Sequence, residues 1–144
     1  MTEKELNEQK KDYLNSYKKL CRKLQSLEER LQSLRETERA AKTQQITDMP
    51  KGGKQTDLSD YMVRVDTLEQ EIYDKSQECI CKKLEIERCI VQMDDGTECD
   101  VLHKRYIELK PWEKICVEIN YSWMQTHRIH GNALNSFMII NGIE

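Results

Sequence analysis

The first forty residues carry apolar side chains at alternating intervals of four and three residues. These positions are Tyr13, Tyr17, Leu20, Leu24, Leu27, Leu31 and Leu34. The spacing is that of the a and d positions of a coiled coil, and mainly polar and charged side chains fill the positions between them. The pattern predicts a long helix over residues 1–43. A single helix of this kind needs a helical partner, because it cannot bury its apolar seam alone.

A second apolar seam follows a short polar stretch. Residues 44–57 contain Pro50 and the glycine pair Gly52-Gly53, which predict a loop. After this loop Leu58, Val65, Ile72, Cys79, Ile86 and Met93 recur every seven residues. We therefore expect a second long helix over 58–95, which ends at Gly96. The two seams close either as an antiparallel hairpin within one chain or between two chains, and we expect a homodimer through the heptad helices.

The apolar stripes become shorter after residue 96. Thr97 and Asp100 have nearly the spacing of a capping box and predict the start of a short helix. Its apolar stripe is Leu102, Tyr106 and Leu109. Lys110-Pro111 ends this helix, and Pro111 suits the first position of the next one. On that helix the apolar face is Trp112, Ile115 and Ile119.

A tight turn separates the second short helix from a third. Asn120 tolerates the positive φ that such a turn requires, and Ser122 suits the N-cap of the third helix. The inward stripe of the third helix is Thr126, Ile129, Ala133 and Phe137, flanked by Leu134. The small Cys116 allows the two helices to cross closely. The fold class is therefore all-α, with a long antiparallel helical hairpin or coiled coil, a three-helix helix-turn-helix domain over 96–138 and a tail over 139–144.

Length, charge and cysteine content indicate which class of protein to expect. The 144 residues make one domain or two, and 34% of them are charged with a net charge of −3. The chain has no apolar run long enough to span a membrane and no signal peptide at its start, so we expect a cytoplasmic protein. The six cysteines include no Cys-x-x-Cys pair, and reduced thiols with no metal site are expected.

Catalytic motifs are missing from the sequence. It shows no Ser/His/Asp arrangement and no paired carboxylates in a recognisable setting. The Pro-Lys-Gly-Gly-Lys segment at 50–54 lacks the full spacing of a phosphate-binding loop. We therefore expect neither an enzyme nor a bound cofactor.

Two segments carry a resemblance to a known family. They are residues 112–122, WEKICVEINYS, and 128–134, RIHGNAL. They resemble region four of bacterial sigma factors and, more closely, the ArpU-like and RinA-like late transcription regulators of phages of Gram-positive bacteria. The resemblance covers about residues 45–135. It implies a phage or prophage origin, action in the cytoplasm of the bacterial host and a role in transcription control.

The helix-turn-helix motif assigns roles to individual side chains, because its second helix lies in the major groove of double-stranded DNA. The outward residues are Trp123, Met124, Gln125, His127 and Arg128. Arg128 suits guanine and Gln125 suits adenine. Phosphate contacts are expected from Ser122, Lys104, Arg105, Lys110 and Lys114, and a backbone contact from His130.

The sequence supports two main candidate functions. The leading one is a DNA-binding transcriptional regulator of a phage, with additional contacts to host RNA polymerase. The alternative is a small phage protein that binds and inhibits or redirects a host protein, such as RNA polymerase or a defence nuclease. Trp123 and Met124 favour the alternative, because sigma-like recognition helices carry arginines there and tryptophan is enriched in protein interfaces. A purely structural coiled coil is the third possibility.

Overall fold

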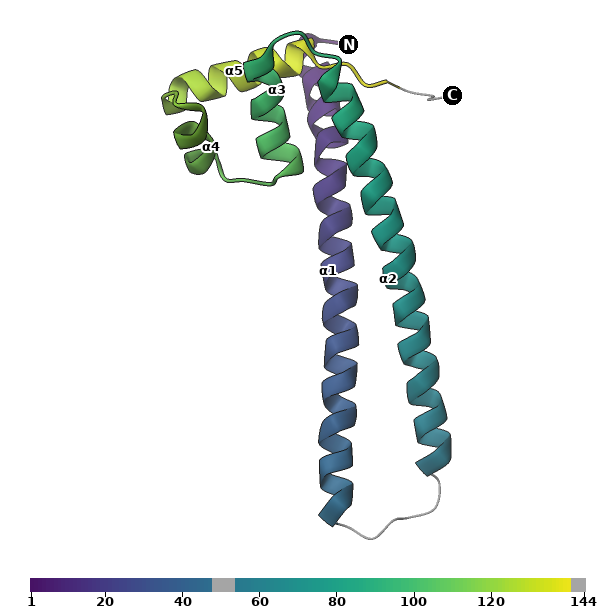
Figure 1. Cartoon of the computed structure of the whole chain (residues 1–144). Helices are drawn as coiled ribbons and strands as arrows, with labels where there is room; N and C mark the ends of the chain where they lie inside the picture. The colour runs from purple at the N-terminus through teal and green to yellow at the C-terminus, as the bar shows by residue number, and fades with distance from the viewer. Residues whose placement is uncertain (48–53, 141–144) are drawn as a thin grey trace. The chain divides into compact units, whose positions relative to one another are not determined.

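The computed structural model describes residues 1–47 and 54–140, and the side chains of residues 1–43 and 58–140. The described residues form helices and no strand (Figure 1). The helices are α1 (Glu3–Thr47), α2 (Lys54–Val91), α3 (Gly96–Leu102), the π-helical turn η1 (His103–Ile107), α4 (Trp112–Ile119) and α5 (Trp123–Ser136). The predicted fold class, an all-α protein with a long helical hairpin followed by a helical domain, is confirmed.

The long helices begin and end differently from the sequence-based expectation. The backbone N–H of Thr2 donates to Glu5 Oε2 at 3.1 Å, and the N–H of Glu5 donates to Thr2 Oγ1 at 3.2 Å. This reciprocal capping box starts α1. Both α1 and α2 run into the stretch 44–57 that the sequence assigned to a loop, and the centre of that stretch, 48–53, lies outside the described residues.

The start of the first short helix requires a correction. Helix α2 ends at Val91, and Asp95 is the N-cap of α3, which begins at Gly96. The Asp95 carboxylate accepts hydrogen bonds from the backbone N–H groups of Thr97 at 2.9 Å and Glu98 at 3.1 Å. Gly96 therefore opens a helix instead of terminating one. Asp95 sets the start of α3, because its carboxylate satisfies two N–H groups that have no partner within the helix.

The end of this helix also departs from the predicted stripe. The wider turn η1 follows α3 directly, and Glu108 N–H donates to His103 O at 2.9 Å. Leu109 then has a φ of 57° and is exposed, so it leaves the stripe and Ile107 is buried in its place. Pro111 precedes α4 as its N-cap and is not its first residue.

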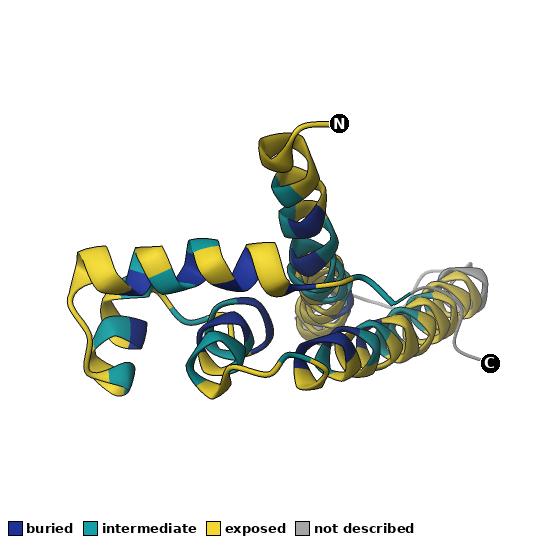
Figure 2. Cartoon of the chain, turned by 90° about the horizontal axis from the view of Figure 1, so that it is seen from above, coloured by how far each residue is buried: buried dark blue, intermediate teal, exposed yellow. Residues whose placement is uncertain are grey.

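The chain divides into two compact units. We call residues 1–20 and 79–144 the core unit and residues 21–78 the hairpin unit. The core unit thus contains the N-terminal part of α1, the C-terminal part of α2 and all the shorter helices. Within it, buried positions gather where α3 and α5 face each other (Figure 2).

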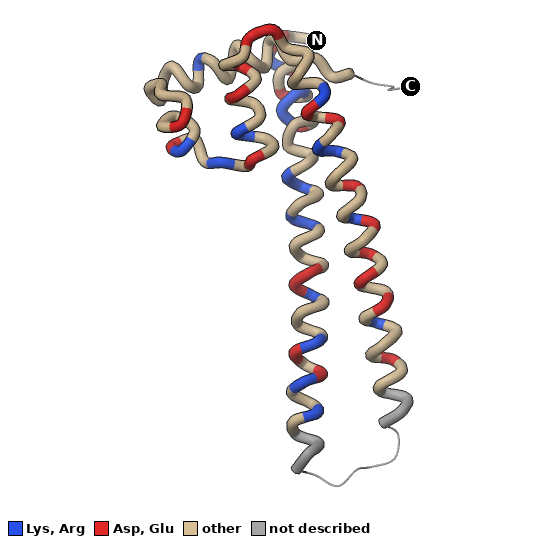
Figure 3. Tube along the Cα trace, in the orientation of Figure 1, with Lys and Arg blue, Asp and Glu red and all other residues tan. Residues whose placement is uncertain are grey.

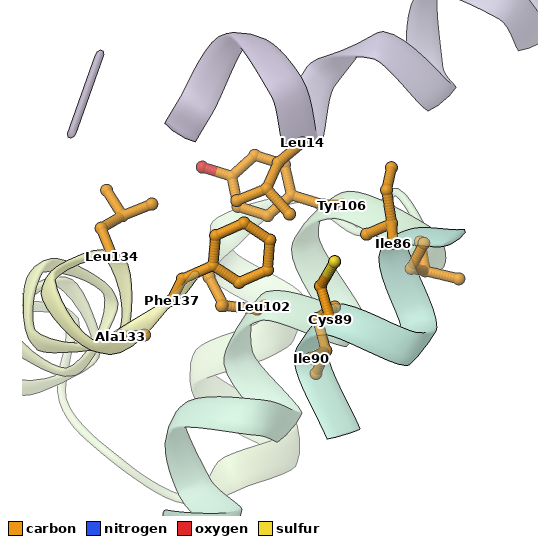
Figure 4. Packing of buried hydrophobic residues seen from close by; sticks show 10 residues of the cluster. Leu14, Ile86, Cys89, Ile90, Leu102, Tyr106, Ala133, Leu134 and Phe137 are labelled. Atoms are coloured by element: carbon orange, nitrogen blue, oxygen red, sulfur yellow. The ribbon is translucent and has the colours of Figure 1, made fainter. Parts of the chain in front are cut away.

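A single apolar cluster holds the core unit together (Figure 4). Its buried members are Leu14, Ile86, Cys89, Ile90, Leu102, Tyr106, Ile107, Ala133, Leu134 and Phe137. Ile139 and Ile140 of the tail pack against this cluster and are partly buried. The buried Lys10 donates from Nζ to the carbonyl oxygens of Leu134 at 2.8 Å and Asn135 at 3.3 Å. A cation at this place satisfies carbonyls that lack partners at the end of α5.

The hairpin unit has a much thinner interior. Among its described residues Leu31 alone is buried, while the other seam leucines of α1 are half-buried. The two helices run antiparallel (Figure 1), and an ion pair of 2.7 Å between Arg35 and Glu69 joins them. An open groove of about 560 Å³ lies between the helices. Basic residues of α1 and mostly acidic residues of α2 line it, and both helices carry charge along their length (Figure 3).

The described residues contain no helix long and apolar enough to cross a membrane. They also contain no group of three histidine, cysteine, aspartate or glutamate side chains placed to hold a metal ion. All six cysteines are free thiols.

Candidate nucleic-acid interface

A tight turn joins α4 and α5 as the sequence predicts. Asn120 adopts a left-handed conformation with φ 60° and ψ 44°. The backbone N–H groups of Asn120 and Tyr121 donate to the carbonyls of Val117 at 3.3 Å and Cys116 at 3.2 Å. This is the usual way to end a helix with a left-handed residue. The predicted role of Asn120 is confirmed.

Ser122 caps the second helix of this motif. Its Oγ accepts a hydrogen bond from the backbone N–H of Gln125 at 3.2 Å. The predicted N-cap is therefore confirmed. Because the cap satisfies only one of the free N–H groups of the first turn, others remain directed outward beside an exposed serine. A helix start of this kind suits a phosphate oxygen in a nucleic-acid complex.

The inner side of α5 packs against α4. Ile115 of α4 and Thr126 of α5 are fully buried. Ala133, Leu134 and Phe137 continue the interior toward the end of α5. The Thr126 hydroxyl has no hydrogen-bond partner among the described residues. The buried position of Thr126 therefore contains a polar oxygen atom in an apolar environment.

The outer side of α5 is polar and carries no acidic residue. Gln125, Arg128 and Asn132 are exposed, and the helix shows one basic residue and no aspartate or glutamate (Figure 3). Trp123 and Met124 are also exposed at its N-terminal end. Met124, Gln125 and Arg128 lie within about 100° of one another around α5 and share one accessible surface. Trp123 lies about 160° away from Gln125, on the side of the buried Thr126 and His130. Asn132 belongs to the same surface and was not predicted, although it lies four residues after Arg128.

His127 is held between two tryptophans. The centroid of its ring lies 4.5 Å from that of Trp112 and 4.5 Å from that of Trp123. Its Nε2 atom is buried and has no hydrogen-bond partner among the described residues. The imidazole therefore packs on both indole rings and is half-buried. This packing was not predicted, although Trp123 and His127 have the i, i+4 spacing that places two side chains in contact on a helix.

His130 lies in the interior and is not a surface residue. It is 8% exposed, and its Nε2 atom shares a hydrogen bond of 2.7 Å with the hydroxyl of Tyr106. Burial lowers the pKa of His130 to about 4, and the nearby charges of Lys11, His127 and Arg105 add to the effect. Burial also raises the pKa of Tyr106 to about 12. The expected contact of His130 with a DNA backbone is corrected by this position, since a buried neutral imidazole cannot reach a phosphate.

Two of the four basic residues predicted before α5, Lys104 and Lys110, are paired with carboxylates. Glu118 binds Lys110 Nζ through Oε2 at 2.9 Å and lies 3.6 Å from Lys104 Nζ. Lys110 also contacts Glu108 at 2.9 Å. The hydrogen bonds from Lys110 and His103 lower the pKa of Glu108 to about 2, and the one from Lys110 lowers the pKa of Glu118. The charges of Lys104 and Lys110 are therefore largely neutralised within the protein.

The remaining cations near the motif differ in their freedom. The guanidinium of Arg105 lies 4.8 Å from the ring centroid of Trp112 and donates to the carbonyl of Lys110 at 3.2 Å. Lys114 and Arg128 are exposed, and neither makes an ion pair within the part of the chain that the structure describes. Of the predicted basic contacts, these two are the exposed ones without an ion pair among the described residues, although the charge of Lys114 contributes to the lowered pKa of Glu118.

The comparisons with known proteins place this motif in a family. Residues 39–137 match the family described as a protein of unknown function (DUF1492). A search of curated proteins and a search of solved structures gave no match. The matched segment covers the end of α1 and the whole of α2, α3, η1, α4 and α5. Because it spans more than half of the chain, the protein belongs to the DUF1492 family.

Proposed function

We propose that this protein is a DNA-binding transcriptional regulator that inserts α5 into the major groove. The finer relationship to the ArpU-like and RinA-like phage regulators, and with it action in a bacterial host, is part of the same proposal. The geometry of the turn supports it, because a left-handed residue followed by a capped second helix is what a helix-turn-helix motif requires.

The observation that carries the proposal is the chemistry of the outer side of α5. Residues 120–143 contain no aspartate or glutamate in a chain that has 26 of them. The exposed Gln125, Arg128 and Asn132 are the side-chain types that form paired hydrogen bonds with adenine and guanine edges. An acid-free surface avoids repulsion from phosphates, while these amide and guanidinium groups supply sequence preference.

Charge pairing limits the electrostatic part of this binding. Lys104 and Lys110 are engaged with carboxylates, whereas Lys114 and Arg128 are exposed and make no ion pair with the described residues. If Lys114, Arg128 and the start of α5 meet phosphates, each motif neutralises about two or three of them. The logarithm of affinity should then fall with the logarithm of salt concentration with a slope of about −2 to −3 per motif.

The test is selection of preferred sites from a random duplex library, followed by fluorescence anisotropy between about 50 and 200 mM salt. Arg128→Ala should reduce the preference between selected and scrambled sites by about tenfold or more, because a paired guanine contact is lost. Lys114→Ala is the matched control, since it should weaken both duplexes equally. Absence of binding at the lowest salt, or an equal loss of selectivity in the two variants, contradicts the proposal.

Exposed apolar side chains on both sides of the α4–α5 turn favour the alternative function, a protein that binds a host protein. They are Val117, Tyr121, Trp123 and Met124, and Val117 and Met124 are 80% and 75% exposed. Apolar and aromatic side chains of this kind are typical anchors of protein interfaces. The proposed partner is a bacterial RNA polymerase or a defence nuclease.

The alternative is tested with purified RNA polymerase holoenzyme and biolayer interferometry in the absence of DNA. Met124→Ala should weaken binding at least about tenfold, whereas Lys114→Ala should leave it unchanged. Met124 is preferred to Trp123 for this test because Trp123 also packs on His127. Equal binding by both variants contradicts an interface at Met124.

A further inference from the structure

Helix α2 carries a second apolar stripe on the side opposite its buried seam. Its members are Tyr73, Ile80, Leu84 and Val91, which are between 50% and 74% exposed. At 100° per residue, all four lie within about 40° of one another around the helix. The buried Ile86 and Cys89 lie roughly 140–160° away from Leu84 on the same helix. An exposed apolar face opposite the buried seam is unusual, because the outer side of a helix in a globular protein is typically polar.

The spacing of this stripe is symmetric. Its members follow at intervals of seven, four and seven residues, which are coiled-coil intervals. The stripe therefore reads the same in both directions along the helix. When a second copy of α2 lies antiparallel to the first, with the twofold axis at Lys82, Ile80 faces Leu84 of the other copy. In the same register Tyr73 faces Val91, so every apolar residue meets an apolar residue.

We propose that the protein forms a homodimer through this stripe, with two α2 helices antiparallel and centred at Lys82. The Lys82 side chain itself points away from the stripe, because its Nζ lies 5.4 Å from the ring centroid of Tyr13. The overlap runs from residue 73 to residue 91 and is about 27 Å long. The interface differs from the heptad seam that the sequence suggested for a homodimer, since that seam is used within the chain.

Charge complementarity along one edge of the stripe favours a second copy as its occupant. Asp74 and Arg88 are exposed and lie on the same side of the stripe. In the antiparallel register each Asp74 lies within about 3 Å, measured along the axis, of Arg88 of the other copy. The twofold axis produces this pairing twice. An unrelated helix would not supply the opposite charge at both ends of the stripe.

The exposed Cys81 marks the centre of the same edge. In the proposed register the two Cys81 residues of a dimer lie on the same side of the interface and differ by about 3 Å in height along the axis. The other described cysteines are buried or half-buried. A short bis-maleimide should therefore join two chains through Cys81, and Cys81→Ser should abolish the cross-linked product.

The primary test is the dissociation constant of the dimer, measured by sedimentation equilibrium. Leu84→Lys should raise it by at least about tenfold, because the substitution places a charge on each side of the centre of the interface. Met62→Lys is the matched control. Met62 lies on the same face of α2 and is 56% exposed, against 57% for Leu84, but it falls outside the overlap of the two helices.

A charge exchange keeps the proposal falsifiable if the lysine variant unfolds. Asp74→Lys and Arg88→Glu should each weaken the dimer, and the double variant should recover much of the affinity, because the pair is restored between chains. A monomer at all concentrations overturns the proposal. So does an equal effect of Met62→Lys and Leu84→Lys, a cross-link that survives Cys81→Ser, or a double variant weaker than both single ones. The inference does not rest on DNA binding, since all these measurements are made without nucleic acid.

Discussion

The core unit and the hairpin unit contain parts of the same two long helices, yet they bury them to different extents. In the core unit Leu14 and Ile86 are fully buried, because α3, α5 and the apolar tail supply further neighbours. In the hairpin unit each helix has only the other, and Leu31 alone of its described residues is buried. A heptad pattern thus predicts which side of a helix is covered, while the number of neighbouring elements decides how completely.

The difference in burial also gives polar side chains different surroundings in the two units. Burial in the core unit produces a neutral histidine at position 130 and an unpaired hydroxyl at Thr126. In the hairpin unit the described threonines are exposed and their hydroxyls make local bonds, as Thr37 does to the carbonyl of Ser33 at 2.9 Å. The predictions below use these contrasts, and they run from the largest expected effect to the smallest.

The same substitution in the two units should have unequal costs. Leu14→Ala should lower the free energy of unfolding of the core unit by about 3 kcal/mol, because it leaves a cavity in a filled interior. Leu27→Ala should cost about 1 kcal/mol, because Leu27 is half-buried beside an open groove. Urea denaturation followed by circular dichroism measures both, and hydrogen exchange assigns each loss to its unit. Equal losses would contradict the contrast between the units.

Acid should destabilise the core unit through His130. Its pKa in the folded protein, about 4, lies below the ordinary value of 6.5, so the unfolded chain binds the additional proton. The free energy of unfolding should be constant above pH 6.5 and fall by about 2 kcal/mol between pH 6.5 and pH 4.5.

The measurement is urea denaturation at several pH values, and His130→Gln is the control. The variant should lose this pH dependence, because glutamine does not titrate. Glu108 does not interfere, since its pKa of about 2 makes its contribution disappear only below pH 4.5. A wild-type protein and a variant with the same slope in this range would show that His130 is not the titrating group.

The turn between α4 and α5 should discriminate between side chains by their tolerance of positive φ. Asn120→Val should destabilise the core unit by about 1–2 kcal/mol, because a β-branched residue is strained in the left-handed region. Asn120→Gly should retain stability within a few tenths of a kcal/mol. Thermal unfolding measures both variants, and the valine variant should also lose any DNA affinity that the glycine variant keeps. A neutral effect of valine would mean that the turn changes conformation without cost.

Much of the fold could be predicted because it depends on local patterns. The helical hairpin follows from the heptad spacing, and the roles of Asn120 and Ser122 follow from their intrinsic conformational and hydrogen-bonding preferences. Asp95 could have been found in the same way, since an aspartate two residues before Thr97 is a good N-cap. The π-helical turn η1 could not have been predicted, because nothing in its composition distinguishes it from a turn of α-helix.

The candidate site was less predictable, since exposure depends on residues distant in the sequence. His130 was assigned to the surface although it lies four residues after Thr126 and three before Ala133, on the stripe that proved to be buried. The neutralisation of Lys110 by Glu118 arises from a turn that brings residues eight apart together. A sequence pattern counts charges, whereas the folded chain decides which of them remain available to a phosphate.

The smallest expected effect concerns a single hydroxyl in each unit. Thr126→Val should raise the free energy of unfolding of the core unit by about 1 kcal/mol, because it replaces a buried hydroxyl that has no partner among the described residues with a methyl group of similar size. Thr37→Val in the hairpin unit should give no gain, since its hydroxyl is exposed and bonded to Ser33. Equal gains from the two substitutions would mean that valine acts through general helix stability. A gain at Thr126 alone would identify the buried hydroxyl as an energetic cost that the packing of α4 on α5 imposes.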